Sequence, residues 1–266
     1  MLNFIKSLIR EMRRDAVFSI SNELTYKILM AAAPFAMFLV SLLGHFDLDV
    51  EILFEKAEPY MPVQIIEVMT LFVRAATENR SGALLSVSLI VSVISAASGF
   101  RGVMRGINIA YDIEEKRGFF SDWALSVFLT LIFAFAISLS LATVIFRRGL
   151  RQILSFSGLA LSAYNFMGFA VALVIIFLTV TLIYKLSCVK RPAWRSVLPG
   201  SSFTVALWLI FSVLFSFYVN AFSNYSKLYG SIGGVFIMII WTNSLAVILL
   251  TGGEINALLR GAKSRP

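Results

Sequence analysis

The chain has 266 residues, of which 59% are hydrophobic and 14% are charged, and its formal net charge is +8. Soluble domains carry about 25% charged residues, so a soluble core could not hide this much apolar surface, and lipid is the expected solvent. Cys188 is the one cysteine, which excludes a disulfide framework and a thiolate metal cage. His45 is the one histidine, which leaves few ligands for a metallohydrolase. We therefore expect an all-α, polytopic membrane helix bundle forming a single membrane domain over 1–266, with no metal and no cofactor.

Residues 1–22 are predicted to form a cytoplasmic amphipathic helix. Apolar residues recur there at helical spacing, and the basic residues lie largely off that face: Lys6, Arg10, Arg13 and Arg14. Such an interfacial helix suits the surface of an anionic membrane. An ordinary lead-in helix packed on the bundle is the alternative interpretation.

Six later stretches have the length and apolar composition of transmembrane helices. They cover about 24–44, 82–99, 123–146, 161–186, 197–221 and 231–258. The first contains Pro34, which removes one backbone hydrogen bond and is a candidate hinge. Residues 223–230 are predicted to form a tight polar hairpin between the last two spans.

The longest connection, residues 45–81, holds seven acidic residues and only three Lys or Arg. Pro59 and Pro62 divide it into two short amphipathic stretches. A structureless loop of this length is unusual. We therefore expect a short helical cap on the periplasmic face.

The segment 95–116 continues from the second span into charged sequence without a proline, which predicts one continuous helix. Arg101, Arg105, Asn108 and Asp112 share a face of that helix. Two guanidinium groups one turn apart at headgroup depth suit an anionic phosphate or carboxylate. The alternative is that these arginines extend into bulk lipid headgroups.

Small residues form a neighbouring face of the same helix: Gly99, Gly102 and Gly106. A second small pair, Gly230 and Gly234, has a GxxxG-like spacing at the start of the last span. Such faces are typical of close helix packing. A flexible hinge is the alternative role.

The distribution of charge predicts the orientation. Six spans put both termini on one side, where the connecting segments hold 15 Lys or Arg, against seven on the other side. By the positive-inside rule, both termini are cytoplasmic. The cluster Arg147, Arg148 and Arg151 opposes this assignment without reversing it.

Several stretches together resemble one known family. They are LTYKILMAAAPF in the first span, SGFRGVMRGINIAYDIEEKRGFF, RPAWRSVLPGSSFTVALW, FYVNAFSNYSKLYGSIGGVFIMIIW and GGEINALL near the end. The chain resembles the YihY/BrkB family of bacterial inner-membrane proteins over nearly its whole length. The resemblance implies six spans and a multi-pass inner-membrane location. Members have been labelled transporters, envelope-related or virulence-associated factors and, by an older name, ribonuclease BN, so it implies no mechanism.

The ribonuclease label can be tested against the residues. Metal-assisted phosphodiester cleavage needs several carboxylates or histidines that converge on one or two cations. The cytoplasmic side has no such set, and the acidic residues 112–122 have the composition of a solvated turn. There is also no GxGxxG or phosphate-loop motif. We therefore expect no enzyme activity, no catalytic residue and no nucleic-acid partner.

Ionisable residues within spans are functional hypotheses, because each is costly in lipid when unpaired. A polar crevice that opens to the cytoplasm is predicted here. It would be lined by Lys27 in the first span and by Asn243 and Glu254 in the sixth. A pair between Lys27 and Glu254 would join the first and last spans. Two alternatives remain: a local pair of Lys27 with Glu23, and a buried ion pair that only fixes helix register.

These features favour a membrane protein that transports or binds a small or lipid-like anionic solute. The expected partners are membrane lipids, in particular anionic phospholipids, and self-association into a homo-oligomer is left open. The rival hypothesis is a non-transporting structural or regulatory envelope protein. A continuous polar cavity would favour transport, whereas a solid core with every charge at its rim would favour the rival.

Overall fold

The computed structural model describes residues 2–44, 66–67, 70, 82–113, 117–154, 159–221 and 224–261. In these ranges the longer elements are α1 (Leu2–Arg14), α2 (Val17–Gly44), α5 (Gly82–Ala110), α6 (Phe119–Leu154), α7 (Leu159–Ser187), α8 (Trp194–Ala221) and α9 (Asn224–Leu259). The all-α prediction is confirmed for this part of the chain. The predicted periplasmic cap lies outside the described residues, apart from helical positions 66–67 and 70.

Four helices are long and apolar enough to cross a membrane. The qualifying segments are Phe119–Ser140, Met167–Ser187, Trp194–Val219 and Gly233–Leu259. They belong to α6, α7, α8 and α9 and coincide with the last four predicted spans. The first two predicted spans, 24–44 and 82–99, lie within α2 and α5, which have 28 and 29 residues.

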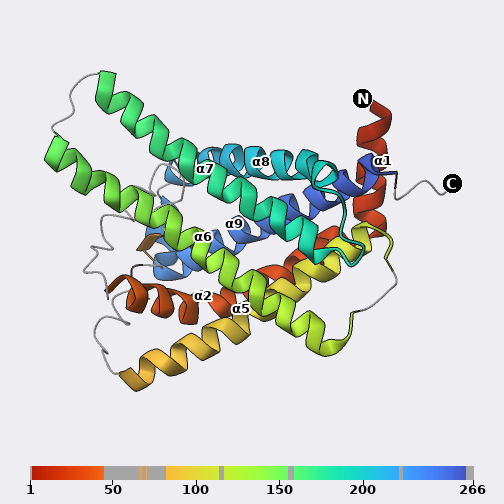
Figure 1. The fold of residues 1–266 in the computed structure, drawn as a ribbon, viewed down its shortest axis with the longest axis horizontal. Coiled ribbons are helices and arrows are strands. Elements are labelled where there is room, and N and C mark those ends of the chain that lie inside the picture. The colour runs from red at the N-terminus through yellow and green to blue at the C-terminus, as the bar shows by residue number, and fades with distance from the viewer. Residues whose placement is uncertain are drawn as a thin grey trace.

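The six long helices close into a ring. Helix α2 packs on α5 and α9, α6 packs on α5 and α7, and α8 packs on α7 and α9. Helix α5 also contacts α7 and α9 across the ring. The short helix α1 contacts α2 and α9 and runs across the end of the bundle where both chain termini lie (Figure 1). We call this the terminal end and the other the distal end.

The first helix is shorter than the predicted 1–22. It ends at Arg14, and α2 begins at Val17. Between them Ala16 has a φ of 51°, a left-handed conformation that costs an L-residue roughly 1–2 kcal/mol. The Ala16 amide donates to the Arg13 carbonyl at 3.2 Å, which closes the last turn of α1. The chain therefore turns sharply before it enters the bundle.

The continuous helix predicted over 95–116 is corrected, because α5 ends at Ala110. Asp112 has a φ of 48°. Its amide donates to the Ile109 carbonyl at 2.9 Å, and the Ile113 amide donates to the Asn108 carbonyl at 3.0 Å. These two bonds form a Schellman motif with Asp112 in the position that glycine usually occupies. Asp112 is thus a helix-ending residue and not part of a basic helix face.

The last long helix starts earlier than predicted, which corrects the hairpin expected over 223–230. Helix α9 begins at Asn224, so the polar residues 224–230 lie in helical backbone. Helix α6 likewise extends past the predicted 146 to Leu154 and includes positions 147, 148 and 151. In both cases a polar stretch without proline continues the helix, since each added residue gains a backbone hydrogen bond.

Candidate functional site

Helix α5 packs closely on its neighbours at two glycines, on α2 at Gly102 and on α9 at Gly106. A Cβ atom at Gly102 would lie 2.6 Å from Cδ2 of Leu24 and 3.8 Å from Nζ of Lys27. A Cβ at Gly106 would lie 2.7 Å from Cδ2 of Leu250. By contrast, no atom lies within 4 Å of a Cβ built at Gly99. Two of the three small residues therefore mark close contacts.

Beside this contact, a carboxylate lies between two cations. Lys27 Nζ donates to Glu23 Oε1 at 2.6 Å, and Arg105 Nη2 of α5 donates to Glu23 Oε2. The side chains of Lys27, Glu23 and Arg105 are 25%, 35% and 54% exposed. Arg101 lies one turn before Arg105 and is half-buried. We call Glu23, Lys27, Arg101 and Arg105 the α2–α5 basic cluster, with three cations for one anion.

The structure pairs Lys27 with Glu23 and places Glu254 elsewhere. Glu254 lies on α9 and is 1% exposed. Leu250, one turn before it, meets α5 at Gly106, while Lys27 meets α5 one turn further into the bundle at Gly102. Lys27 and Glu254 therefore belong to different levels and different helix contacts. The local pairing of Lys27, one of the alternatives, is the contact observed.

Asn108 caps the neighbouring helix α7. Its Nδ2 donates to the Ser187 carbonyl at 3.0 Å and the Met104 carbonyl at 2.8 Å, and its Oδ1 accepts from the Val189 amide at 2.9 Å. The last carbonyls of a helix have no partner within the helix, so such contacts stabilise its end. Asn108 is thus engaged in packing, away from the two arginines of the predicted stripe.

Arg117 completes this cap. Its guanidinium donates to the carbonyls of Leu186 and Cys188 at 2.9 Å each, and to that of Ser187 at 3.3 Å. Burial lowers the pKa of Arg117, although the nearby charge of Asp122 opposes this. A cation at a helix C-terminus also interacts favourably with the helix dipole. Sequence reasoning did not single out Arg117, because its partners lie about seventy residues away.

Asn243 joins α9 to the opposite side of α2. Its Nδ2 donates to Asn22 Oδ1 at 2.8 Å and to Thr25 Oγ1 at 3.1 Å. Asn22 is exposed, as is Tyr26 one turn later, which is 62% exposed. Helix α2 therefore carries polar contacts along both of its seams, with α5 on one side and with α9 on the other.

A buried polar junction joins α7, α8 and α9 near the terminal end. The hydroxyl of Tyr184 donates to the Leu249 carbonyl at 2.6 Å and lies 2.6 Å from Thr204 Oγ1. Asn256 Oδ1 accepts from the Gly200 amide at 2.7 Å. Tyr184, Thr204 and Asn256 are completely buried. We call this set the α7–α8–α9 junction.

Glycines allow that junction to form. A Cβ at Gly200 would lie 2.1 Å from the carbonyl oxygen of Gly252, and one at Gly252 would lie 2.1 Å from Thr204 Oγ1. The backbones of α8 and α9 are thus in direct contact. The sequence signals for this contact, VLPGSS and TGGEIN, each combine glycine with small or polar residues inside an apolar span.

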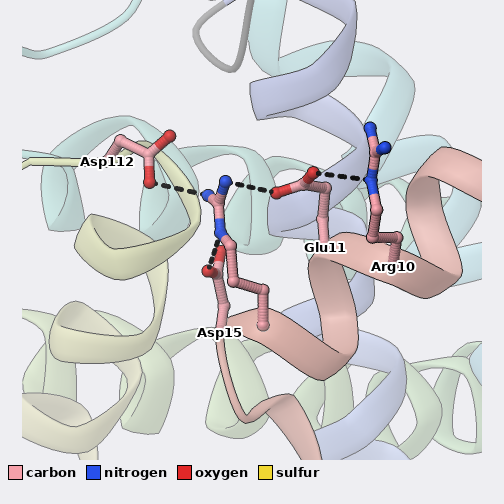
Figure 2. A network of polar contacts seen from close by, with 5 residues as sticks. Arg10, Glu11, Asp15 and Asp112 are labelled. Carbon is pink, nitrogen blue, oxygen red and sulfur yellow. Dashed lines mark hydrogen bonds and ion pairs between the residues drawn. The ribbon is translucent and has the colours of Figure 1, made fainter. Parts of the chain in front are cut away.

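A network of ion pairs ties α1 to the turn after α5 (Figure 2). Arg14 contacts Glu11 at 2.9 Å, Asp15 at 3.0 Å and Asp112 at 2.8 Å. The side chains of Glu11 and Asp15 are only 7% and 6% exposed. The hydrogen bond to Asp15 is the main cause that raises the pKa of Arg14. The network thus holds α1 to the bundle at both left-handed turns.

The remaining predicted residues lie in helical backbone. Gly234 is buried within α9. Pro34 and Gly230 occupy helical backbone in α2 and α9. Their role as hinges stays a prediction. Among the described residues, no three His, Cys, Asp or Glu side chains gather in a way that could hold a metal ion.

Comparison with known proteins identifies the family. The model of the family described as "Virulence factor BrkB" matches residues 8–266. A protein of Bacillus subtilis named as ribonuclease-like, YfkH, is 33% identical over 269 residues, covering 100% of this chain and 98% of its own. Proteins named UPF0761 membrane protein in two strains of Vibrio cholerae are 23% identical over 270 residues, covering 97% of this chain and 87% of theirs. No solved structure matches this chain significantly. With its membrane-spanning helices and a match over nearly its whole length, the chain belongs to the BrkB family of membrane proteins.

Proposed function

We propose that this protein binds an anionic solute, lipid-like or small, at the α2–α5 basic cluster. The observation that carries the proposal is the excess of cations there: Lys27 and Arg105 both pair with the carboxylate of Glu23, and Arg101 lies one helical turn from Arg105 on α5. Lysine has three hydrogen-bond donors and arginine has five, so both keep donors free after binding Glu23. A phosphate or carboxylate would complete the charge balance of the cluster.

The proposed setting is a bacterial inner membrane crossed six times, with both termini in the cytoplasm. The shortest of the six long helices have 28 residues, which corresponds to a length of about 42 Å. This length exceeds the thickness of the hydrocarbon core, about 30 Å, and supports the proposal. The two termini lie at one end (Figure 1). Exposed basic residues gather at that same end: Lys6, Arg10, Arg13, Lys190, Arg191, Arg195 and Arg260. This distribution is the one that the positive-inside rule requires of a cytoplasmic face.

Transport through a crevice that opens to the cytoplasm is the further part of the proposal. It would require the α7–α8–α9 junction to separate, because Glu254 is buried beside it on α9. Asn243 and Lys27, on the two seams of α2, would then contribute to the path. Uptake of an anionic fluorescent lipid or of labelled phosphate into proteoliposomes tests this part separately from binding.

A non-transporting structural or regulatory membrane protein is the second candidate function. The observation that favours it is the α7–α8–α9 junction itself, where backbone contacts fill the interior and buried hydroxyl and amide groups bond to one another. The three cations and the one anion of the basic cluster are half-buried or exposed and lie outside this junction. A protein that binds lipid but moves none would fit this candidate.

The binding proposal is tested with the double variant Arg101→Gln/Arg105→Gln. Hydrogen bonds to charged groups contribute about 1.5–3 kcal/mol, so loss of two guanidinium groups that contact the ligand should lower affinity by about tenfold or more. Binding is measured by native mass spectrometry of the purified full chain with added anionic phospholipid. The control, Arg13→Gln/Arg195→Gln, removes the same charge from exposed positions elsewhere at the terminal end. Equal affinities for the two double variants would contradict the proposal.

A further inference from the structure

The outward surface of α2 has polar side chains next to the basic cluster. Asn22 and Tyr26 are exposed, and Asn22 precedes Glu23 in the chain. Asn243 of α9 reaches the same surface through its hydrogen bond to Asn22. We call Asn22, Tyr26 and Asn243 the α2 polar face. It extends the polar surface from the seam with α5, across α2, to the seam with α9.

This face lies near the boundary between hydrocarbon and lipid headgroups in the proposed orientation. Helix α2 exceeds the hydrocarbon thickness by about 12 Å, which leaves about 6 Å, or four residues, at each end. Asn22 and Tyr26 belong to the first three turns of α2. Helical side chains tilt toward the N-terminus, which for α2 is the headgroup side. Asn22 therefore lies close to the hydrocarbon boundary, and Tyr26 lies one turn deeper with its side chain directed toward that boundary.

The face retains unused hydrogen-bonding groups. The bond between Asn243 Nδ2 and Asn22 Oδ1 leaves the Asn22 amide NH₂ as a donor and Asn243 Oδ1 as an acceptor. Within the described part of the chain, the Tyr26 hydroxyl makes no hydrogen bond. Amide and phenol groups both donate and accept, so together they suit a hydroxyl group better than they suit a bare phosphate oxygen.

We infer that the ligand is a glycerophospholipid whose headgroup carries hydroxyl groups, such as phosphatidylglycerol. This inference rests on the proposed function of the basic cluster. The phosphate lies against Arg101, Arg105 and Lys27, and the headgroup hydroxyls bond to the α2 polar face. Phosphatidic acid would fill only the first part of this site. Phosphatidylethanolamine would bring a positive amine toward three cations, which is unfavourable.

The test compares lipid selectivity in the wild-type chain and in the variant Asn22→Leu/Tyr26→Phe. Both side chains are exposed, and Asn243 keeps its bond to Thr25 when its bond to Asn22 is lost, so the fold should tolerate the changes. One or two hydrogen bonds to the headgroup should make the wild type prefer phosphatidylglycerol over phosphatidic acid by about two- to tenfold. The variant should lose this preference and keep its affinity for phosphatidic acid. Native mass spectrometry measures both affinities and the oligomeric state.

Each other outcome has a separate meaning. Equal wild-type affinity for the two lipids, or displacement of lipid by millimolar inorganic phosphate, would overturn the headgroup inference and leave anion binding in place. Loss of the preference only with Arg101→Gln/Arg105→Gln, and not with the polar-face variant, would also overturn it. No effect of the arginine variant on either lipid would overturn the proposed function itself. A wild-type oligomer that the polar-face variant dissociates would show that a second copy, and not lipid, covers the face.

Discussion

At the terminal end of the bundle, side chains from five long helices are completely or almost completely buried. Examples are Leu24, Ile107, Leu129, Tyr184 and Val197. Nearer the distal end, the described parts of the same helices contribute fewer buried side chains. They expose Ile90 of α5 at 58%, Met167 of α7 at 57% and Phe217 of α8 at 75%, and Phe119 and Phe120 at the start of α6 are exposed as well. A smaller buried cluster nearer the distal end comprises Val219, Ile237 and Met238.

The two ends of the bundle gain their stability from different sources. At the distal end the exposed apolar side chains face lipid, which is as apolar as they are, so burial there gains little. At the terminal end, stability depends on backbone contact and on buried hydrogen bonds, as in the α7–α8–α9 junction and in the cap on α7. Substitutions should therefore have unequal effects at the two ends.

The largest effect is expected for Gly200→Val. Its Cβ would lie 2.1 Å from a backbone oxygen of α9, which cannot move aside as a flexible side chain can. Overpacking of this kind costs about 3 kcal/mol or more. The variant should yield little folded protein by size-exclusion chromatography. Gly99→Ala, where the added atom meets nothing within 4 Å, is the matched control and should behave as the wild type.

The next effect is expected for Asn108→Leu. The substitution removes the side-chain bonds to Ser187 and Val189 and leaves a part-buried carbonyl and amide without those partners. Such a loss costs roughly 1–3 kcal/mol. The melting temperature of the purified protein should fall accordingly, with normal lipid binding at the basic cluster. An unchanged melting temperature would show that water replaces the cap.

A smaller effect is expected from raised pH, again at the terminal end. Burial raises the pKa of the Cys188 thiol and of the Tyr111 hydroxyl. The folded state thus holds these protons more tightly than the unfolded state does. The resulting stability is complete below the unfolded thiol pKa, about 8.5, and is lost as pH rises through the folded value.

The melting temperature should therefore stay constant from about pH 6 to pH 8 and fall above about pH 9. The variant Cys188→Ala removes the thiol contribution, so its melting temperature should fall less steeply over that range. Parallel curves for the two proteins would assign the loss to other groups.

The smallest effect is expected for Phe217→Ala at the distal end. The side chain is 75% exposed, and lipid can take its place. The free energy of unfolding should therefore change by no more than about 0.5 kcal/mol, with a correspondingly small shift in melting temperature. Leu250→Ala is the comparison at the terminal end. Leu250 is 3% exposed, so its truncation should cost about 2–5 kcal/mol. Equal losses would contradict the difference between the two ends.

The sequence predicted the helical class and the positions of the apolar spans, because both depend on local composition. It did not predict where the helices stop. Ala16 and Asp112 end helices in a conformation that usually calls for glycine, and of the two only aspartate is a residue type that tolerates it. The two ends are joined by tertiary contacts, since Arg14 pairs with Asp15 and with Asp112.

The candidate site likewise has one contact that the sequence predicts and others that it does not. The pair of Lys27 with Glu23 follows from helical spacing and could be foreseen. The second partner of Glu23, Arg105, is 82 positions away, and the partners of Asn108 on α7 are about 80 away. Such pairings depend on which helices become neighbours. Hydropathy and charge counts do not contain that information.

The ion pair between Arg14 and Asp112 also constrains the order of biosynthesis. The two residues are 98 positions apart, so Arg14 leaves the ribosome well before its partner is translated. At 5–20 residues per second, the delay is about 5–20 s. During that interval α1 has no α5 turn to bind. Its final attachment must therefore follow insertion of the second long helix, which makes the N-terminal segment of the chain one of the later parts to reach its native position.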